Sequence, residues 1–418
     1  MEIINKEYIE LGFVKESAGR GVNSQVIMEA IGGGEFRLTE GRVGIKIGRL
    51  KPRSFTFPME RWDEILSKKL RQGYMVTKNR KMERKEVKKS GILYAGENFA
   101  TIQDTGVREI FGRLCRFADN AIQENFTITI DDISDEMLSL GKEILGGLAT
   151  EYEKMSVTEF NSKLKILYAA IPRRIDNLSK LLANRKAQFR DIISQEQDLY
   201  DILYSQVRQN SLSANAGVNK DVLCYLGLEW RCASDEEEQM LKNKLGSESG
   251  RFVQAWRITN QKTEAAFEKY CQSEHLTEPD GISHLFHGSR NENFFSIITN
   301  GLTINPTGVV ITGKAYGNGT YFAPAAVKSM GYTSRSGSKW ASGNSPTGFL
   351  GVYKVATGKR YNGKNGCDSS LNYRKLQEIC PGAHCTWAEA RCSGFMMDEV
   401  IVYQDQQSAI EYLVEVGL

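Results

Sequence analysis

Three short stretches in the second half of the chain carry the residue types that could do chemistry. The first is HLFHGSR at residues 284–290, which holds two of the four histidines of the chain. The others are GKAYGNGTYFAPAAVKSMGY at residues 313–332 and MDEVIVY at residues 397–403. A carboxylate can stabilise developing positive charge, and a tyrosine can stack on a flat, polarised ring. In isolation each of these residues is more typical of a core, turn or surface position. A functional interpretation therefore depends on the order in which the residues follow one another.

That order resembles the poly(ADP-ribose) polymerase family. The family has His-Gly-Ser, then Gly-x-Gly-x-Tyr-Phe-Ala with Lys-Ser and Tyr downstream, then Glu-x-Ile-Val-Tyr near its C-terminus, and this chain has the same blocks over roughly residues 219 to 418. The resemblance implies an α+β ADP-ribosyltransferase domain that uses NAD as a substrate and modifies protein acceptors, itself included. It assigns catalysis to three residues, which are His287, Tyr321 and Glu399.

The resemblance also implies how NAD is held. The histidine would hold the adenine-side ribose, the Gly288 backbone and the Ser329 hydroxyl would bond the nicotinamide amide, and Tyr332 would stack on its ring. Lys328 would act with Glu399 on the acceptor and in chain elongation. The full expected NAD-binding set is His287, Gly288, Ser289, Asn293, Tyr321, Ser329 and Tyr332.

The expected reaction explains these residue types. Breaking the nicotinamide–ribose bond builds oxocarbenium-like charge on the sugar, as in glycoside hydrolysis, and Glu399 would stabilise it and orient the acceptor hydroxyl. No glycine-rich phosphate loop precedes a helix, so NAD is expected as substrate and not as redox cofactor. We expect no metal. Cys380, His384, Cys385 and Cys392 could suggest zinc, but their spacing is unusual for zinc ligands, and reduced loop thiols are the alternative.

Two departures from the family pattern keep other functions open. Asn318 stands where the family often has a lysine, and Thr303 where some members carry an arginine toward adenine. Glutamate as the third catalytic residue, with Lys328, favours a polymer-forming enzyme. A mono-ADP-ribosyltransferase and an inactive scaffold that binds NAD or ADP-ribose are the alternatives.

The first 95 residues are predicted as a small β-rich module, with strands at residues 26–28, 36–38 and 43–47 and a short helix at residues 61–66. The run Glu40-Gly41-Arg42-Val43-Gly44 resembles the Trp-Gly-Arg-Val-Gly motif within the WGR module of DNA-dependent family members, with Glu40 in place of the tryptophan, and residues 1 to 95 as a whole resemble that module. Binding of DNA or RNA and a packing role are both left open for this module. The carboxylate of Glu40 would be repelled by the phosphates of a nucleic acid.

A basic run at residues 78–89 has seven basic and two acidic side chains. It could contact phosphates, act as a nuclear localisation patch or form a solvated helix face. The candidate nucleic-acid contacts are therefore Arg42, Lys78, Arg80 and Lys81.

Residues 96–217 are predicted as an all-α domain, because leucine and isoleucine recur at three- and four-residue spacings. This domain resembles the regulatory helical domain of the DNA-dependent family branch, which implies autoinhibition and a place in the DNA damage response. Residues 208–221, rich in Ser, Asn and Gly, are predicted as a linker, and residues 218–418 as the transferase with a strand at 348–355. The predicted fold class is multidomain α+β.

Composition limits the class of protein. A net charge of +3 gives no overall bias toward polyanions, and no apolar run reaches the roughly 18 residues of a membrane span. We expect a nuclear or cytoplasmic protein with no membrane partner and with reduced cysteines, since eight cysteines without regular spacing do not suggest a disulfide scaffold.

Overall fold

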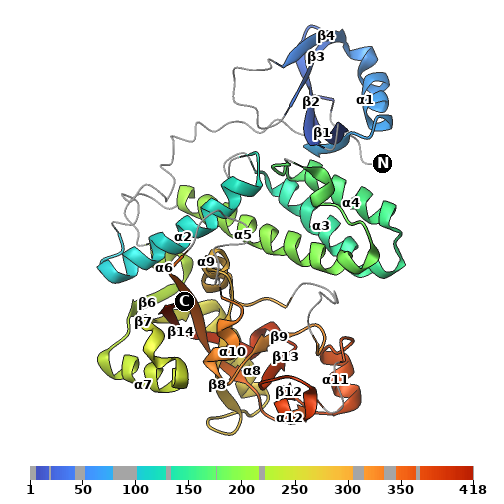
Figure 1. Ribbon diagram of the computed structural model, residues 1–418. Helices are drawn as coiled ribbons and strands as arrows, with labels where there is room; N and C mark the ends of the chain where they lie inside the picture. Colours follow the sequence, from blue (N-terminus) through green and yellow to red (C-terminus); the bar gives the residue numbers. More distant parts are fainter. Residues whose placement is uncertain are drawn as a thin grey trace. The chain divides into compact units, whose positions relative to one another are not determined.

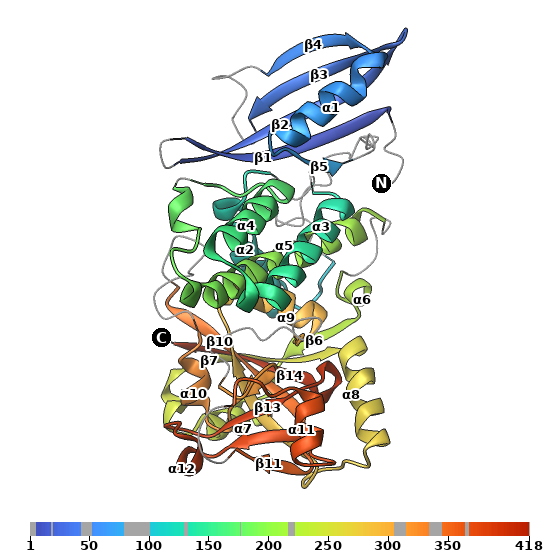
Figure 2. The same ribbon diagram turned by 90° about the vertical axis from the view of Figure 1, so that its right-hand side faces the viewer.

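Figures 1 and 2 show a computed structural model of the chain in two views. The residues that it describes are 6–17, 20–42, 52–78, 101–128, 133–175, 177–215, 222–304, 315–333, 345–363 and 368–417. Among these residues no helix is long and apolar enough to cross a membrane. Helices and sheets occur together, as expected for a mixed α and β chain.

The contacts divide the chain into two compact units. The first unit comprises Met1–Lys89 and Gln123–Tyr200, and the second comprises Ser90–Ile122 and Asp201–Leu418. Two helices, α2 (Thr105–Asn125) and α5 (Phe189–Asn215), cross the boundary, so each belongs partly to both units. The predicted division into module, helical domain and transferase stays a prediction.

The first unit begins with an antiparallel sheet in the order β4-β3-β2-β1-β5. Its elements are β1 (Tyr8–Ser17), β2 (Arg20–Gly32), β3 (Glu35–Arg42), β4 (Arg53–Pro58), α1 (Trp62–Arg71) and β5 (Met75–Lys78). Trp62 is fully buried and meets Phe36 of β3 edge-on, so α1 covers one face of the sheet. The β2–β3 turn passes through Gly33 and Gly34, both at positive φ, which a side chain would strain.

The helices of the first unit follow this sheet. They are α3 (Asp135–Glu151), α4 (Val157–Ala170) and the first part of α5. A capping box starts α4, because the Ser156 hydroxyl accepts from the Glu159 amide and the Glu159 carboxylate accepts from the Ser156 amide. The sheet packs on α4 closely: a Cβ on Gly12 of β1 would lie 2.7 Å from the carbonyl oxygen of Ala169.

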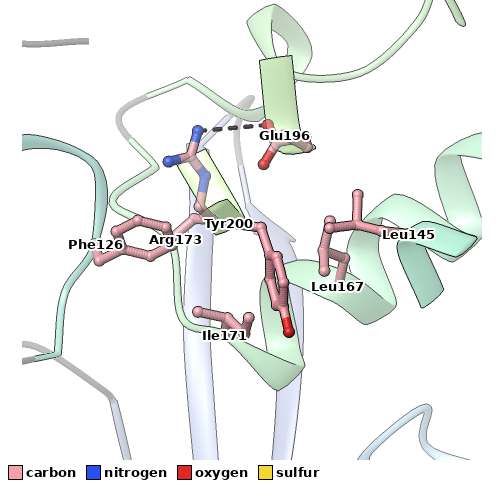
Figure 3. A pocket seen from close by; sticks show the side chains of 7 residues that line it. All are labelled: Phe126, Leu145, Leu167, Ile171, Arg173, Glu196 and Tyr200. Atoms are coloured by element: carbon pink, nitrogen blue, oxygen red, sulfur yellow. Dashed lines mark hydrogen bonds and ion pairs between the residues drawn. The ribbon is translucent and has the colours of Figure 1, made fainter. Parts of the chain in front are cut away.

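A small pocket lies among these helices (Figure 3). It is lined by Phe126, Leu145, Leu167, Ile171, Arg173, Glu196 and Tyr200. A guanidinium nitrogen of Arg173 lies 3.4 Å from Glu196 Oε1, and the exposed fractions of the two side chains are 3% and 7%. The Tyr168 hydroxyl donates to the same oxygen at 3.2 Å. The walls are therefore mainly apolar, with one buried ion pair that ties α5 to the segment after α4.

The second unit contains two sheets, in the orders β6-β7-β14-β10-β8 and β11-β12-β13-β9. Neighbouring strands are antiparallel except for β11 and β12. The strands are β6 (Leu228–Cys232), β7 (Phe252–Asn260), β8 (Ile282–Gly288), β9 (Thr320–Phe322), β10 (Thr347–Ala356), β11 (Arg360–Asn362), β12 (Cys385–Ala388), β13 (Glu399–Val402) and β14 (Ser408–Gly417). The helices are α6 (Val222–Leu226), α7 (Asp235–Leu245), α8 (Gln261–Ser273), α9 (Asn291–Asn300), α10 (Ala326–Met330), α11 (Tyr373–Ile379) and α12 (Ala390–Ser393).

The two sheets meet at one backbone bridge. The amides of Phe286 in β8 and Ala323, just after β9, each donate to the carbonyl of the other at 2.9 Å. The five-stranded sheet is also contacted by α2, where Arg113 makes two bonds, of 2.9 and 2.6 Å, to the buried carboxylate of Glu415 in β14. The second unit thus includes the α2 residues up to Ile122 as well as the two sheets.

Several predicted elements are confirmed. The predicted strands at residues 26–28, 36–38 and 348–355 lie in β2, β3 and β10, and the helix expected at 61–66 is α1. The strand expected at 43–47 lies outside the described residues. The linker expected at residues 208–221 is wrong in its first part, because α5 continues to Asn215. Extending an existing helix is far easier than starting one, so a Ser- and Asn-rich tail can continue α5.

Candidate active site

His287 lies near the end of β8, beside the bridge that joins the two sheets. Its Nδ1 is 2.9 Å from the carbonyl oxygen of Tyr321, and because a carbonyl only accepts, Nδ1 carries the proton. The ring packs edge-on against Phe322 and Tyr353, with centroid distances of 5.7 and 6.0 Å. The structure thus brings His287 and Tyr321 together and fixes the orientation of the imidazole.

Tyr321 holds the glycine-rich loop that precedes β9. Its hydroxyl accepts from the Tyr316 amide at 2.9 Å and donates to the Gly317 carbonyl at 3.1 Å. The loop needs glycine at position 317, since φ is +74° and a Cβ would lie 1.9 Å from the Leu371 carbonyl oxygen. In β13 the register partner of Tyr321 is Ile401. Because side chains alternate along a strand, Glu399 lies on the same face of the sheet as Tyr321.

Glu399 begins β13 and is 5% exposed. Its Oε1 lies 2.8 Å from Lys328 Nζ of α10 and 3.5 Å from the hydroxyl of Tyr332. Burial, and then the negative charge of Glu399, raise the pKa of Tyr332 above its ordinary value, so its hydroxyl stays protonated and can donate. Tyr332 as a whole residue is 60% exposed. The buried carboxylate of Glu399 therefore lies next to Tyr332, an aromatic residue that is exposed to solvent.

Gly288 and Ser329 also meet. A Cβ on Gly288 would lie 1.9 Å from the Ser329 carbonyl oxygen, so only glycine allows β8 to approach α10 this closely. The buried Ser329 hydroxyl donates to the Phe286 carbonyl at 3.1 Å, which leaves its oxygen able to accept from an amide. Next to them Asn293 of α9 donates to the Ser289 hydroxyl at 3.0 Å. The expected NAD-binding residues thus fall on β8, α9, β9 and α10 or, for Ser289 and Tyr332, just after β8 and α10.

The two departures from the family pattern differ in their surroundings. Asn318 is 6% exposed, and its amide oxygen has no hydrogen-bond partner among the described residues. Its backbone amide donates to the carbonyl oxygen of Leu371 at 2.8 Å. Thr303 is exposed.

The candidate nucleic-acid contacts are largely outside the described residues. Arg80 and Lys81 lie outside them, as does the rest of the basic run except Lys78. Arg42 and Lys78 are the last residues of β3 and β5. Glu40 of β3 forms an ion pair with Lys69 of α1. The carboxylate is thereby neutralised locally.

Metal ligation finds no support in the part of the chain that the structure describes. No group of three or more His, Cys, Asp or Glu side chains is arranged there to hold an ion. Of the residues considered for zinc, His384 accepts from the Lys359 amide at 3.0 Å and buried Cys385 donates to the Thr357 carbonyl at 3.2 Å. The described cysteines are free thiols.

Two contacts near the site were not predicted. The ammonium of Lys328 lies 5.0 Å from the centre of the Phe395 ring, which restrains it beside Glu399. Tyr353 of β10 packs against His287 and is fully buried. Phe395 stands four residues before Glu399 in an apolar run, and this nearness in the sequence could have indicated a residue of the site. Tyr353 lies in an ordinary buried strand, so nothing in the sequence marks it as a neighbour of His287.

Comparison with known proteins matches residues 235–418 to the family described as Poly(ADP-ribose) polymerase catalytic domain. A putative poly [ADP-ribose] polymerase-like protein, 100L of Invertebrate iridescent virus 6, is 33% identical over 168 residues, which are 38% of this chain and 83% of that protein. The chain belongs to the poly(ADP-ribose) polymerase family. A catalytic domain of this family uses NAD as its substrate and needs no metal.

Two other proteins are similar to larger parts of the chain. Poly [ADP-ribose] polymerase 2 of Arabidopsis thaliana is 22% identical over 357 residues, which are 75% of this chain and 54% of that protein. An uncharacterized protein, 101L of Invertebrate iridescent virus 6, is 25% identical over 197 residues, or 47% of this chain and 77% of that protein. All the predicted catalytic residues lie within the region that matches the catalytic domain.

Proposed function

We propose that this chain transfers ADP-ribose from NAD to protein acceptors, itself included, releases nicotinamide, and extends the product into poly(ADP-ribose). The observation that carries the proposal is the setting of Glu399. This carboxylate is buried at the start of β13, and one of its oxygens meets both the Lys328 ammonium and the Tyr332 hydroxyl.

In the proposed reaction the nicotinamide–ribose bond breaks and positive charge develops on the ribose. Glu399 stabilises that charge and orients the acceptor hydroxyl that attacks the sugar. The Gly288 backbone and the Ser329 hydroxyl bind the nicotinamide amide, while Tyr332 stacks on the pyridinium ring. His287, whose Nδ1 is held by the Tyr321 carbonyl, presents its other nitrogen to the adenine-side ribose.

Polymer formation requires that the acceptor be a sugar hydroxyl of a previous unit. The Lys328–Glu399 pair supports this, because it joins a cation and a base at the place where the acceptor must approach. Transfer of a single ADP-ribose and binding without transfer are the competing functions. Each gives a different product pattern.

We further propose that the helices before the transferase hold it inactive until nucleic acid binds, and that the enzyme acts in the nucleus. Support comes from α2, where Arg113 contacts Glu415 of β14 through two charge-assisted bonds. Arg113→Ala should raise the basal rate if this contact restrains the transferase. Arg108→Ala is the matched control, since Arg108 on the same helix donates to the nearby Ile102 carbonyl. Equal basal rates in the two variants would argue against restraint by this contact.

Labelled NAD, followed on a denaturing gel with and without broken-ended DNA, tests the proposal. A DNA-dependent smear of high mass in the parent chain, lost in Glu399→Gln, is the expected result. Glu378→Gln is the control, because Glu378 is an exposed ion-pair carboxylate on α11. A single discrete band would indicate mono-transfer. Intact NAD and no label would favour a scaffold.

A further inference from the structure

His284 is the histidine of the HLFHGSR stretch that the proposed reaction does not use. It lies on β8, three residues before His287, and side-chain alternation places the two on opposite faces of the strand. The strand order puts β8 at the edge of its sheet, next to β10 alone. On its other side the described residues add only the bridge from Phe286 to Ala323. The strand that carries His287 and Gly288 is therefore less firmly held than the central strands.

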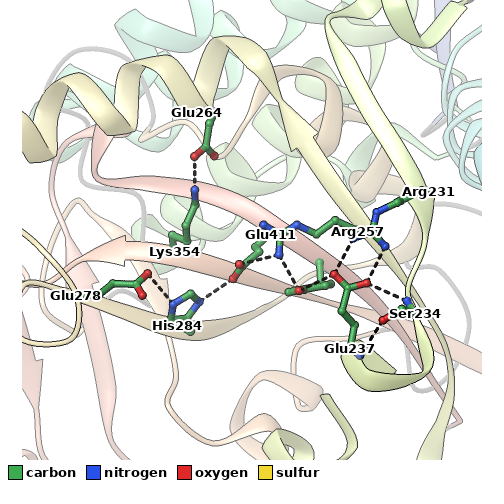
Figure 4. A network of polar contacts seen from close by, with 10 residues as sticks. Arg231, Ser234, Glu237, Arg257, Glu264, Glu278, His284, Lys354 and Glu411 are labelled. Carbon is green, nitrogen blue, oxygen red and sulfur yellow. Dashed lines mark hydrogen bonds and ion pairs between the residues drawn. The ribbon is translucent and has the colours of Figure 1, made fainter. Parts of the chain in front are cut away.

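The ring of His284 lies between two carboxylates (Figure 4). Its Nδ1 is 2.6 Å from Glu411 Oε2, and its Nε2 is 3.1 Å from Glu278 Oε1. A neutral imidazole has one N–H and could donate to only one of them. Ionised carboxylates cannot donate in return, so both bonds together require the protonated ring. The contact is therefore an ion-pair bridge, and it forms only when His284 is charged.

Glu411 reaches His284 because of a β-bulge. The register between β10 and β14 passes from Val352 opposite Tyr412 to Tyr353 opposite Ile410, which leaves Glu411 without an opposite residue. A bulge of this kind re-aims a side chain. Here the carboxylate of β14 reaches past β10 to His284 on β8, so the bridge spans three strands. Its Glu411 end is largely buried, since that side chain is 11% exposed, whereas the side chains of His284 and Glu278 are 34% and 57% exposed.

The other charged groups around the bridge are already engaged. Lys354, the register partner of His284 on β10, pairs with Glu264 of α8. The remaining oxygen of Glu411 accepts from Arg257 of β7 at 2.9 Å. Lys244 of α7 donates to the backbone carbonyl of His284 at 2.7 Å.

Arg257 continues the network away from β8. It donates to the Tyr412 hydroxyl at 2.6 Å, and that hydroxyl donates to Glu237, which Arg231 binds through two bonds (Figure 4). The residue that can change its charge near neutral pH in this network is His284.

The titration of the bridge agrees with its geometry. The hydrogen bond to Glu411 raises the pKa of His284 above its ordinary value, and burial opposes this only in part. Burial acts to raise the pKa of Glu411, but the bond to His284 and the neighbouring positive charges outweigh it and lower that pKa. Both shifts favour the charged pair.

We propose that His284 is a positioning residue for the transfer reaction, which in its protonated form fastens the edge strand β8, and with it His287 and Gly288, to β14 across β10. The inference rests on the proposed function for its effect on rate. It makes the site depend on pH through a residue that touches neither NAD nor acceptor.

The sign of the pH dependence follows from linkage. A histidine whose pKa is raised by folding contributes stability that is fully present below its unfolded pKa, which is about 6.5. That contribution is lost as the pH rises through the higher folded pKa. The bridge is therefore expected to loosen as the pH rises above about 6.5, through the raised folded pKa of His284.

The test compares pH profiles of nicotinamide release in the full chain. In the parent, kcat/KM should fall about tenfold as His284 deprotonates, which is at the low end for a hydrogen bond to a charged group. His284→Gln cannot titrate and should give a low, flat profile. His284→Arg keeps a positive charge and should remain active at alkaline pH. His384→Gln is the matched control, since His384 meets Glu274 with one nitrogen only and lies off β8.

Amide hydrogen exchange of β8, measured in the same samples, does not depend on activity. Protection of residues 282–288 should fall with rising pH in the parent, stay high in His284→Arg and stay low in His284→Gln. An alkaline fall in rate that persists in His284→Gln, or β8 protection that is equal in all variants, would overturn the inference. If the parent releases no nicotinamide at any pH, the proposed function fails, and the exchange data still decide whether His284 fastens β8.

Discussion

Glu196 and Glu399 make the same three-group arrangement in two different regions. Each carboxylate meets one cation and one tyrosine hydroxyl: Glu196 meets Arg173 and Tyr168, and Glu399 meets Lys328 and Tyr332. Around Glu196 all three residues are buried. Around Glu399 the lysine side chain is 22% exposed and the tyrosine 60% exposed.

The difference separates a structural arrangement from one that can bind. The groups around Glu196 are all buried among the helices, so they serve the packing of the helices. Glu399 is buried itself, but its partners Lys328 and Tyr332 are partly exposed to solvent. A buried charge near an accessible ring is what a reaction with a cationic transition state needs. Four predictions test this distinction.

The largest effect is expected from Glu196→Ala. Removing one partner of a buried ion pair leaves the Arg173 charge buried, which should lower the free energy of unfolding by about 3 to 5 kcal/mol. Urea unfolding followed by circular dichroism would measure it. Glu153→Ala is the control, because Glu153 pairs with Arg190 and is 71% exposed. A loss below about 1 kcal/mol in Glu196→Ala would mean that this arrangement is not sealed.

Glu399→Gln should have the opposite profile. The rate of nicotinamide release should fall by about 10² to 10³, the range for loss of one preorganised charge-stabilising group. The free energy of unfolding should change by less than about 1 kcal/mol, because water can reach the lysine left behind. Stopped-flow or coupled assays and a melting curve on the same protein would check both. If Glu399→Gln were destabilised but still active, Glu399 would have a structural role like that of Glu196.

A double replacement sharpens the comparison from the structural side. Arg173→Met with Glu196→Leu removes both buried charges and keeps the volume, so it should recover most of the roughly 3 kcal/mol that Glu196→Ala loses. Urea unfolding of the single and double variants gives the difference. A double variant as unstable as Glu196→Ala would show that the hydrogen bonds, and not the unpaired charge, carry the stability.

The smallest effect is expected at a third pair, Glu40 of β3 with Lys69 of α1. The Glu40 side chain is 36% exposed, so Glu40→Gln should change the free energy of unfolding by no more than about 1 kcal/mol. Thermal unfolding would measure this. A loss of unfolding free energy as large as that of Glu196→Ala would mean that the Glu40–Lys69 pair is a structural pair like that of Glu196 and Arg173.

Much of the candidate site could be predicted because its residues are adjacent in short stretches. Lys328, Ser329 and Tyr332 fall within one helical turn and its end, so their order in the sequence almost determines their proximity. His287 and Gly288 follow each other on one strand. The glycine at position 288 could be interpreted only with the structure, because the Ser329 carbonyl that excludes a side chain is 41 positions later.

The remaining features depend on contacts between distant parts of the chain. The sequence alone indicates no role for His284, because its partner Glu411 is 127 positions away and reaches it only through a bulge. Arg113 meets Glu415 across 302 positions, so apolar spacing could predict α2 as a helix but not the sheet that it contacts. The end of α5 was missed because Ser and Asn weaken the periodic signal without stopping a helix that has already started.

The course of α5 limits how the chain can be divided into fragments. Its residues up to Tyr200 belong to the first compact unit and those from Asp201 to the second, where Ser205 bonds Ser296 of α9 at 2.6 Å. A fragment that begins at Val222 would lack Ser205 and would therefore lose the contact between α5 and α9, the helix that carries Asn293. Recombinant transferase fragments should therefore retain the whole of α5, and a protease that cuts within it should damage both halves at once.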